Sequence, residues 1–187
     1  MSEQNRSNDS PRSRKISELV DQLASNDGME RREARHELEE LGNDAGPQLA
    51  QALSSQEENV RWEAAKALSH IKDPATAPAL AKALMDERFE VQWLAAEALI
   101  ALGQDAVVPI LRELTSSYGS LYLRQGAHHV LHALERKRML EPRVQRVIDE
   151  LRSLEPLEPF PITAKRALDS LTGKHQQNGK EAARKTA

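Results

Sequence analysis

The residues in this sequence with the clearest potential for chemistry are histidines, which occur at two places where they could act together. His36 is followed directly by Glu37, so an imidazole and a carboxylate stand side by side. His128 and His132 are four residues apart, a spacing that places both rings on one face of a helix, and His129 lies between them. Imidazole and carboxylate groups are common ligands of zinc and iron, so each place could form part of a metal site.

Neither place holds enough ligands for a complete metal site. After the histidine cluster, the first carboxylate on the same predicted helix is that of Glu135. We therefore interpret His36 as a half-exposed helix residue and the cluster at 128–132 as a polar interface position with solvent-facing imidazoles. Binding of a metal or another ligand at this cluster is the alternative. The sequence predicts no metal and no cofactor.

Other catalytic arrangements are missing from the sequence. It contains no cysteine, which excludes a thiolate nucleophile, a thiolate metal site and a disulfide framework. No serine stands in the Gly-x-Ser-x-Gly pattern of hydrolases, and no glycine-rich loop that could hold phosphate groups is present. We therefore expect no catalytic residue and predict that the protein is not an enzyme.

The charge distribution argues against nucleic acid as a partner. The net charge is -3, from 26 basic and 29 acidic residues. Both ends are basic, so the excess of acidic side chains lies within 16–171, where it would repel a phosphate backbone. The first residues lack the apolar segment of a signal peptide, and the sequence predicts no membrane span. We expect a cytoplasmic protein that does not bind a membrane.

A sequence repeat organises the middle of the chain. Pro47, Pro78 and Pro109 are spaced 31 residues apart. The segment 60–68, VRWEAAKAL, matches the segment 91–99, VQWLAAEAL, at the same spacing. Within each copy the apolar residues recur at helical intervals, which indicates one buried helix face. Weaker copies occupy 32–41 and 124–131.

Each unit predicts two helices. The first, for example 60–71, is expected to end at a loop of the kind seen at 102–105, where Gly103 can end the helix and Asp105 can cap the next one. Gly42 and Asp44 stand in the same way before Pro47. The second helix begins with the repeated proline, whose missing N–H costs nothing in a first turn. One helix pair cannot bury its apolar side, so neighbouring pairs must stack. The predicted fold is all-α, an α-α superhelix of about four helix pairs with caps.

We expect four segments along the chain. Residues 1–14 form a disordered tail, and residues 15–152 form the repeat domain. Residues 153–171 form a proline-rich segment and a capping helix over 162–171, and residues 172–187 form a disordered basic tail. Apolar residues of the capping segment are expected to cover the last repeat, namely Phe160, Ile162, Ala167, Leu168 and Leu171.

Two stretches, VRWEAAKALSHIKDPATAPALAKAL and VQWLAAEALIALGQDAVVPILREL, resemble the HEAT-like repeats named after phycobilisome lyase subunits. The resemblance covers roughly residues 29–152 and implies an armadillo-like helical solenoid. The family includes bilin-attachment enzymes, deoxyhypusine hydroxylase and bacterial scaffold or adaptor proteins, so the resemblance implies the fold and leaves the function open.

The two enzyme branches imply sites that this sequence does not match well. The hydroxylase branch implies several His-Glu dyads that together hold two irons, and His36-Glu37 is the one dyad present. The bilin-attachment branch implies a longer, paired solenoid. We expect no dedicated pocket, because the aromatic residues besides the two tryptophans are few: Phe89, Tyr118, Tyr122 and Phe160. The pairs equivalent to the dyad are Lys66-Ala67, Glu97-Ala98 and His128-His129.

The residues best suited to binding a partner stand at repeated positions. Trp62 and Trp93 occupy the same place in consecutive units and could form a row of interface anchors. The alternative is that each indole covers the junction between two repeats. A second row lies on the proline-containing helices and is expected to face the concave groove of the solenoid: Gln51, Lys82 and Glu113, with Met85 one turn beyond Lys82.

These features predict a non-enzymatic scaffold or adaptor that binds a peptide or helix of another protein along the solenoid groove. The alternative is an accessory subunit or enzyme of the bilin-lyase-like or hydroxylase-like branch, which the family resemblance alone supports.

Overall fold

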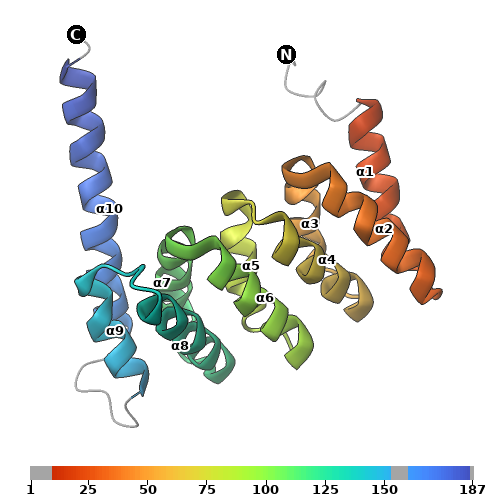
Figure 1. Cartoon of the computed structure of the whole chain (residues 1–187). Coiled ribbons are helices and arrows are strands. Elements are labelled where there is room, and N and C mark those ends of the chain that lie inside the picture. Colours follow the sequence, from red (N-terminus) through yellow and green to blue (C-terminus); the bar gives the residue numbers. More distant parts are fainter. Residues whose placement is uncertain (1–9, 153–159, 186–187) are drawn as a thin grey trace.

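The computed structural model describes the backbone of residues 10–152 and 160–185, and the side chains of residues 10–152 and 161–173. Within these ranges the chain forms helices and no strand (Figure 1). Short 3-10 turns, Gly42–Asp44, Pro74–Thr76 and Gly103–Ala106, join some of the helices. The helices are α1 (Pro11–Gln22), α2 (Gly28–Leu41), α3 (Gly46–Ala52), α4 (Glu58–Ile71), α5 (Ala77–Ala83), α6 (Phe89–Leu102), α7 (Val107–Ser116), α8 (Leu121–Arg136), α9 (Pro142–Arg152) and α10 (Phe160–Lys185).

The helices stack in two layers. The front layer consists of α2, α4, α6 and α8, which lie side by side, and the back layer consists of α3, α5 and α7 behind them (Figure 1). At one end α1 packs against α2 and α3, and at the other end α10 packs against α7 and α9. The predicted superhelix of about four helix pairs with capping helices is therefore confirmed.

Alanine and leucine build the core between the layers. Small alanine side chains let neighbouring helices of the front layer approach closely, and leucines fill the remaining space. The leucines with less than 2% exposure include Leu68, Leu80, Leu99 and Leu111. The buried alanines on α4 and α6 are Ala64, Ala65, Ala67, Ala95, Ala96 and Ala98.

One stretch of the core is apolar and long enough, by length and composition, to cross a membrane: Phe89–Ser116. In the structure this stretch is two helices, α6 and α7, joined by the 3-10 turn that starts at Gly103. More than half of its most apolar window, 56%, is buried inside the protein. Its apolar side chains thus belong to the core of the repeats.

Glycines end two helices of the front layer, as predicted. Gly42 after α2 and Gly103 after α6 have φ values of 61° and 64°, which side chains other than glycine rarely adopt. The predicted caps at Asp44 and Asp105 are wrong, since α3 and α7 have no side-chain cap. The reason is that each aspartate belongs to a 3-10 turn, and the residue that precedes the next helix is an alanine, Ala45 or Ala106.

The N-terminal end of the array starts earlier than predicted. Helix α1 begins at Pro11, inside the segment 1–14 that the sequence predicts to be disordered. Ser10 caps this helix by accepting the N–H of Ser13 at 3.1 Å, and a proline is favourable in the first turn. Residues 1–9 and the proline-rich 153–159 lie outside the described residues, so the boundaries placed there stay predictions.

The C-terminal helix extends beyond its predicted end at 171. The backbone of α10 is helical through Lys185, because no proline follows Pro161 and good helix formers such as Lys, Gln and Ala are frequent. Ala167 is buried, and Leu168 and Leu171 pack against the core. Ile162 is 42% exposed, so its predicted covering role is wrong. The buried stripe of α10 runs instead through Thr163, Ala164 and Ala167, and the side chain of Phe160 lies outside the described residues.

Replacing Gly103 or Gly42 by alanine is expected to lower the free energy of unfolding by about 1–3 kcal/mol, because alanine is strained at a positive φ. At Gly42 no atom stands within 4 Å of the added methyl group, so strain acts alone. Gly119→Ala is the matched control, since it has open space and no positive φ, and its stability should stay close to that of the wild type. Urea denaturation measures all three variants. Wild-type stability of Gly42→Ala would contradict the argument.

Candidate functional site

An open groove lined by aromatic side chains lies in the front layer, between the N-terminal halves of α6 and α8. We call it the aromatic groove. Its volume of about 380 Å³ is enough for one or two side chains of a partner or for a small ligand. The lining residues are Glu87, Phe89, Gln92, Trp93 and Ala96 from α6 and the loop before it, and Tyr122, Gln125, Gly126 and His129 from α8.

The rings of the aromatic groove are exposed and close to one another. Phe89 and Trp93 are one turn apart on α6, and their ring centroids are 6.4 Å apart. On the other side, the Trp93 ring lies 5.2 Å from the imidazole of His129. Phe89 is 68% exposed, Trp93 48% and Tyr122 53%. Two further exposed apolar side chains stand just before and at the start of α8, Tyr118 and Leu121.

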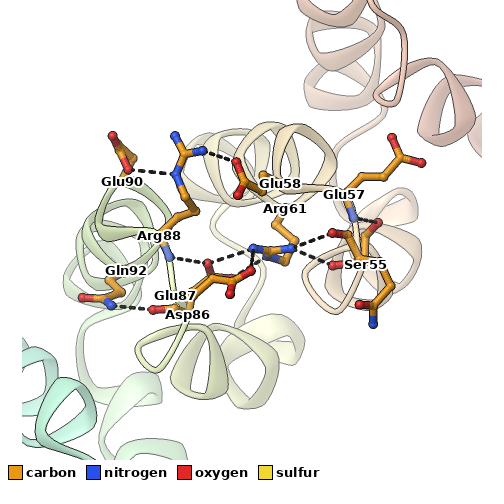
Figure 2. Close-up of polar contacts among 10 residues, drawn as sticks. Ser55, Glu57, Glu58, Arg61, Asp86, Glu87, Arg88, Glu90 and Gln92 are labelled. Carbon is orange, nitrogen blue, oxygen red and sulfur yellow. Dashed lines mark hydrogen bonds and ion pairs between the residues drawn. The ribbon is translucent and has the colours of Figure 1, made fainter.

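The loop in front of α6 is held by Arg61 of α4 (Figure 2). Its guanidinium donates to both carboxylate oxygens of Asp86, at 2.7 and 3.3 Å, and to Glu87 at 3.0 Å. It also donates to the carbonyls of Ser55 at 2.9 Å and Gln56 at 3.2 Å, in the loop before α4. Arg61 is buried, and its hydrogen bond to Asp86 raises the pKa of the guanidinium. One cation therefore ties the loops of two consecutive repeats together.

Part of the Arg61 contact recurs along the array. In three consecutive repeats, a side chain near the start of the front-layer helix donates to a carbonyl six residues earlier. The side chain of that earlier residue in turn accepts the backbone N–H two positions further on, which fixes the start of the helix. Among the three accepting residues, Asp86 also forms an ion pair with an arginine of the preceding repeat, Arg61. The donor and acceptor pairs are Arg31 and Ser25, Arg61 and Ser55, and Gln92 and Asp86.

Two partly or fully exposed carboxylates lie at or beside the aromatic groove. The side chain of Glu87 is 77% exposed and that of Glu97 is 46% exposed. Glu90 lies in the first turn of α6 on the side that faces α4 and does not line the groove; a hydrogen bond from its own backbone N–H, and after it Arg88, lower the pKa of its carboxyl group. Arg88 contacts both Glu58 and Glu90 (Figure 2). The groove is therefore lined by the carboxylate of Glu87, which Arg61 contacts through one oxygen, and the carboxylate of Glu97 stands beside it.

The two tryptophans predicted as a row of anchors have different surroundings. Trp62 is half-buried and packs against the core, and the guanidinium of Arg35 on α2 lies 6.0 Å from its ring centroid. Its position suits the alternative reading, an indole that covers the junction between repeats. Trp93 is turned to α8 and exposed in the aromatic groove, so it is the tryptophan placed for binding.

The second predicted row lies on the back layer. Gln51 and Lys82 are exposed, and Glu113 is partly exposed. Lys82 and Met85 line a shallow groove of about 450 Å³ between α3 and α5, whereas Gln51 lines a separate groove between α1 and α3. The structure does not bring this row together with Trp93, which is on the front layer. The binding role of the row stays a prediction.

His36, the histidine of the predicted dyad, and His70 of the next repeat both contact one glutamate. The Nδ1 atoms of His36 and His70 lie 3.3 and 3.1 Å from the carboxylate of Glu39. Within the part of the chain that the structure describes, no group of three or more His, Asp or Glu side chains is arranged to hold a metal ion.

The cluster at 128–132 forms a small network with the last helix of the array. As predicted, His128 and His132 share a helix face, with their rings stacked 5.7 Å apart. Arg152 of α9 lies 3.3 Å from His128 Nε2 and 2.8 Å from His132 Nδ1, and His132 also contacts Glu135 at 3.0 Å. Burial lowers the pKa of His128, and the charge of Arg152 adds to this effect. The network therefore favours the neutral form of the His128 imidazole, which can accept from Arg152.

Reasoning from the sequence found Trp93 but missed the rest of the aromatic groove. The sequence does not predict that Phe89, Tyr122 and His129 lie together. The expectation that no dedicated pocket exists is wrong for this groove. A signal was present, because Phe89 and Tyr122 stand at the starts of two equivalent helices, which stacking of the repeats places side by side.

A family model described as HEAT repeats matches the chain twice, over residues 16–99 and over residues 47–132. Together the two matches cover more than half of the chain and reach from α1 into α8. A search of curated proteins gives no match.

Replacing Arg61 by leucine is expected to lower the free energy of unfolding by about 3 kcal/mol, because the buried carboxylate of Asp86 would lose its cation. Urea denaturation followed by circular dichroism measures the loss. Asp86→Ser is the matched variant, since serine stands at this position in the two preceding repeats and can still accept the Arg88 N–H. Its loss should be clearly smaller. A loss below about 1 kcal/mol for Arg61→Leu, the range of surface ion pairs, would show that the contact does not hold the repeats.

His128 should make the stability of the protein depend on pH. Its pKa in the folded state is lowered from 6.5, so the stability that it contributes is complete above that value and is lost as the pH falls. His128→Gln removes this titration and can still accept from Arg152. Its melting temperature should therefore fall less than that of the wild type between about pH 7.5 and about pH 5.5. Parallel curves for the two proteins would refute the effect.

Proposed function

Because the chain belongs to the HEAT-repeat family, we propose that it is a non-enzymatic cytoplasmic adaptor that binds a segment of another protein, with the aromatic groove as the main contact surface. The observation that carries the proposal is the exposure of Phe89, Trp93 and Tyr122 next to one another. Adjacent exposed aromatic side chains are typical of interaction sites, where a partner covers them.

The composition of the whole chain strengthens this argument. The sequence contains six aromatic residues, two each of Trp, Tyr and Phe. Four of them lie at the starts of α6 and α8 or in the loop before α8, and all four are about half exposed or more. The core of the repeats is built without them, from alanine and leucine. Rings that packing does not use are available to a partner.

The titratable groups at the groove support binding in preference to catalysis. Glu87 contacts Arg61, and His129 lies 3.6 Å from Glu97, which stands beside the groove. Neither arrangement directs an acid and a base at one common point, as general acid–base catalysis requires. The finer resemblance to phycobilisome lyase repeats, and the accessory or enzymatic role that it implies, stay predictions.

The proposal predicts that a partner protein co-purifies with the tagged chain from lysate of its own organism. A variant with Phe89→Ala, Trp93→Ala and Tyr122→Ala should lose this partner, because the rings supply the contact area. The three side chains are exposed, so the variant should keep the circular dichroism spectrum and melting temperature of the wild type. Quantitative mass spectrometry of the purified material measures the loss.

The matched control reverses two charges on the back layer, with Lys82→Glu and Glu113→Lys, and it should keep the partner. A partner lost from the control but kept by the triple variant would move the binding site to the back layer. If no protein is enriched with the wild type over either variant, the adaptor proposal fails.

A further inference from the structure

The aromatic groove combines ring faces with hydrogen-bond acceptors. The rings are tilted, with interplanar angles of 35° for Phe89 and Trp93 and 34° for Trp93 and His129, so they do not cover one another face to face. The side-chain nitrogen of Gln92 donates to the backbone carbonyl of Asp86. The side-chain oxygen of Gln92 can accept a hydrogen bond. Glu87 contacts Arg61 through one carboxylate oxygen and is 77% exposed.

The charges next to the aromatic groove are mainly negative. Glu87 lines it, and Glu97 stands beside it, 3.6 Å from His129. Of the nearby cations, Arg61 contacts one carboxylate oxygen of Glu87 and is otherwise engaged with Asp86 and two backbone carbonyls. Arg88 is directed to α4, where it contacts Glu58. Arg124 is in the first turn of α8. The residues of α8 that line the groove are 122, 125, 126 and 129, and because successive helix residues are rotated by about 100°, Arg124 lies on another face of that helix.

We propose that the aromatic groove binds an arginine side chain carried by a segment of the partner protein, an inference that rests on the adaptor function proposed above. A guanidinium is planar, so it can stack on the open faces of Phe89, Trp93 or Tyr122. Its N–H groups form a fork that fits a carboxylate, and Glu87 presents one at the edge of the groove. The two requirements, an aromatic face and an acceptor, are met within one cavity of about 380 Å³.

Other occupants fit the groove less well. A purely apolar side chain would cover the carboxylate of Glu87 and the amide oxygen of Gln92 without offering them a donor, which is costly. An acidic segment would meet Glu87 and Glu97 with like charge. Lysine carries a compact, strongly hydrated charge that stacks on rings less well than the planar guanidinium.

A selection from a phage library of random dodecapeptides tests the proposal. The full chain is the target, and the Phe89→Ala, Trp93→Ala, Tyr122→Ala variant is used for counter-selection. We expect peptides specific for the wild type to be enriched in arginine. For the strongest synthetic peptide, replacing its arginine by glutamine should weaken binding about tenfold, with lysine intermediate, as titration calorimetry would measure.

Matched variants of the chain test the carboxylate. Glu87→Gln should weaken the arginine peptide severalfold and leave its glutamine version unchanged. Glu18→Gln, an exposed carboxylate on α1, removes the same charge far from the groove and should have no effect. If Glu87→Gln and Glu18→Gln weaken binding of the arginine peptide equally, the weakening comes from the net charge of the protein, and the assignment of Glu87 is overturned.

The remaining outcomes separate this inference from the adaptor proposal. Groove-specific peptides without enriched arginine would overturn the arginine assignment and leave the adaptor proposal standing. A dimer in sedimentation that dissociates in the triple variant would place a second copy of the chain in the groove and also overturn the assignment. The adaptor proposal itself depends on the co-purification experiment, which does not require arginine.

Discussion

The structure depends first on the contact between consecutive helices of the front layer, above all α4 and α6. Buried alanines line both helices there, so the backbones approach closely without large side chains between them. A helix pair that exposes an apolar side has no stability of its own, and each repeat is completed by its neighbour. Close packing alone does not fix how far one helix slides along the next. Arg61 supplies that constraint, because it binds the loop of its own repeat and the loop of the following one.

The same constraint places the aromatic groove. Asp86 and Glu87 precede α6 directly, so the contacts of Arg61 determine where that helix starts and hence where Phe89 and Trp93 stand. In the two earlier repeats the residue equivalent to Asp86 is Ser25 or Ser55, and a serine hydroxyl does not form the ion pair that Asp86 forms with Arg61. The junction that Arg61 holds is thus next to the exposed rings of the aromatic groove. Rings held on a firmly placed helix lose little freedom when a partner covers them, which favours binding.

The sequence predicts the fold well, because a period of 31 residues with one apolar helix face allows few arrangements other than stacked helix pairs. It predicts helix ends at glycine correctly, but it fails at Asp44 and Asp105, where the chain continues through a 3-10 turn instead of starting a new helix. The groove is harder to predict for a geometric reason. It is lined by one flank of α6 and the opposite flank of α8, and residues 122, 125 and 129 are not the repeat equivalents of 89, 92 and 96. An alignment of repeats compares residues at equivalent positions, whereas the facing sides of two neighbouring helices carry residues from different positions of the repeat.

This geometry also explains why one repeated residue has two roles. Trp62 and Trp93 are equivalent in sequence, yet Trp62 lies under Arg35 of the preceding helix and Trp93 stands against His129 of the following helix. Neighbouring side chains therefore decide whether the indole covers a junction or remains exposed. Glu87 connects the two functions, since it lines the groove and also contacts Arg61. A cation bound at Glu87 would share that carboxylate with Arg61, so occupation of the groove acts directly on the contact that sets the junction between α4 and α6.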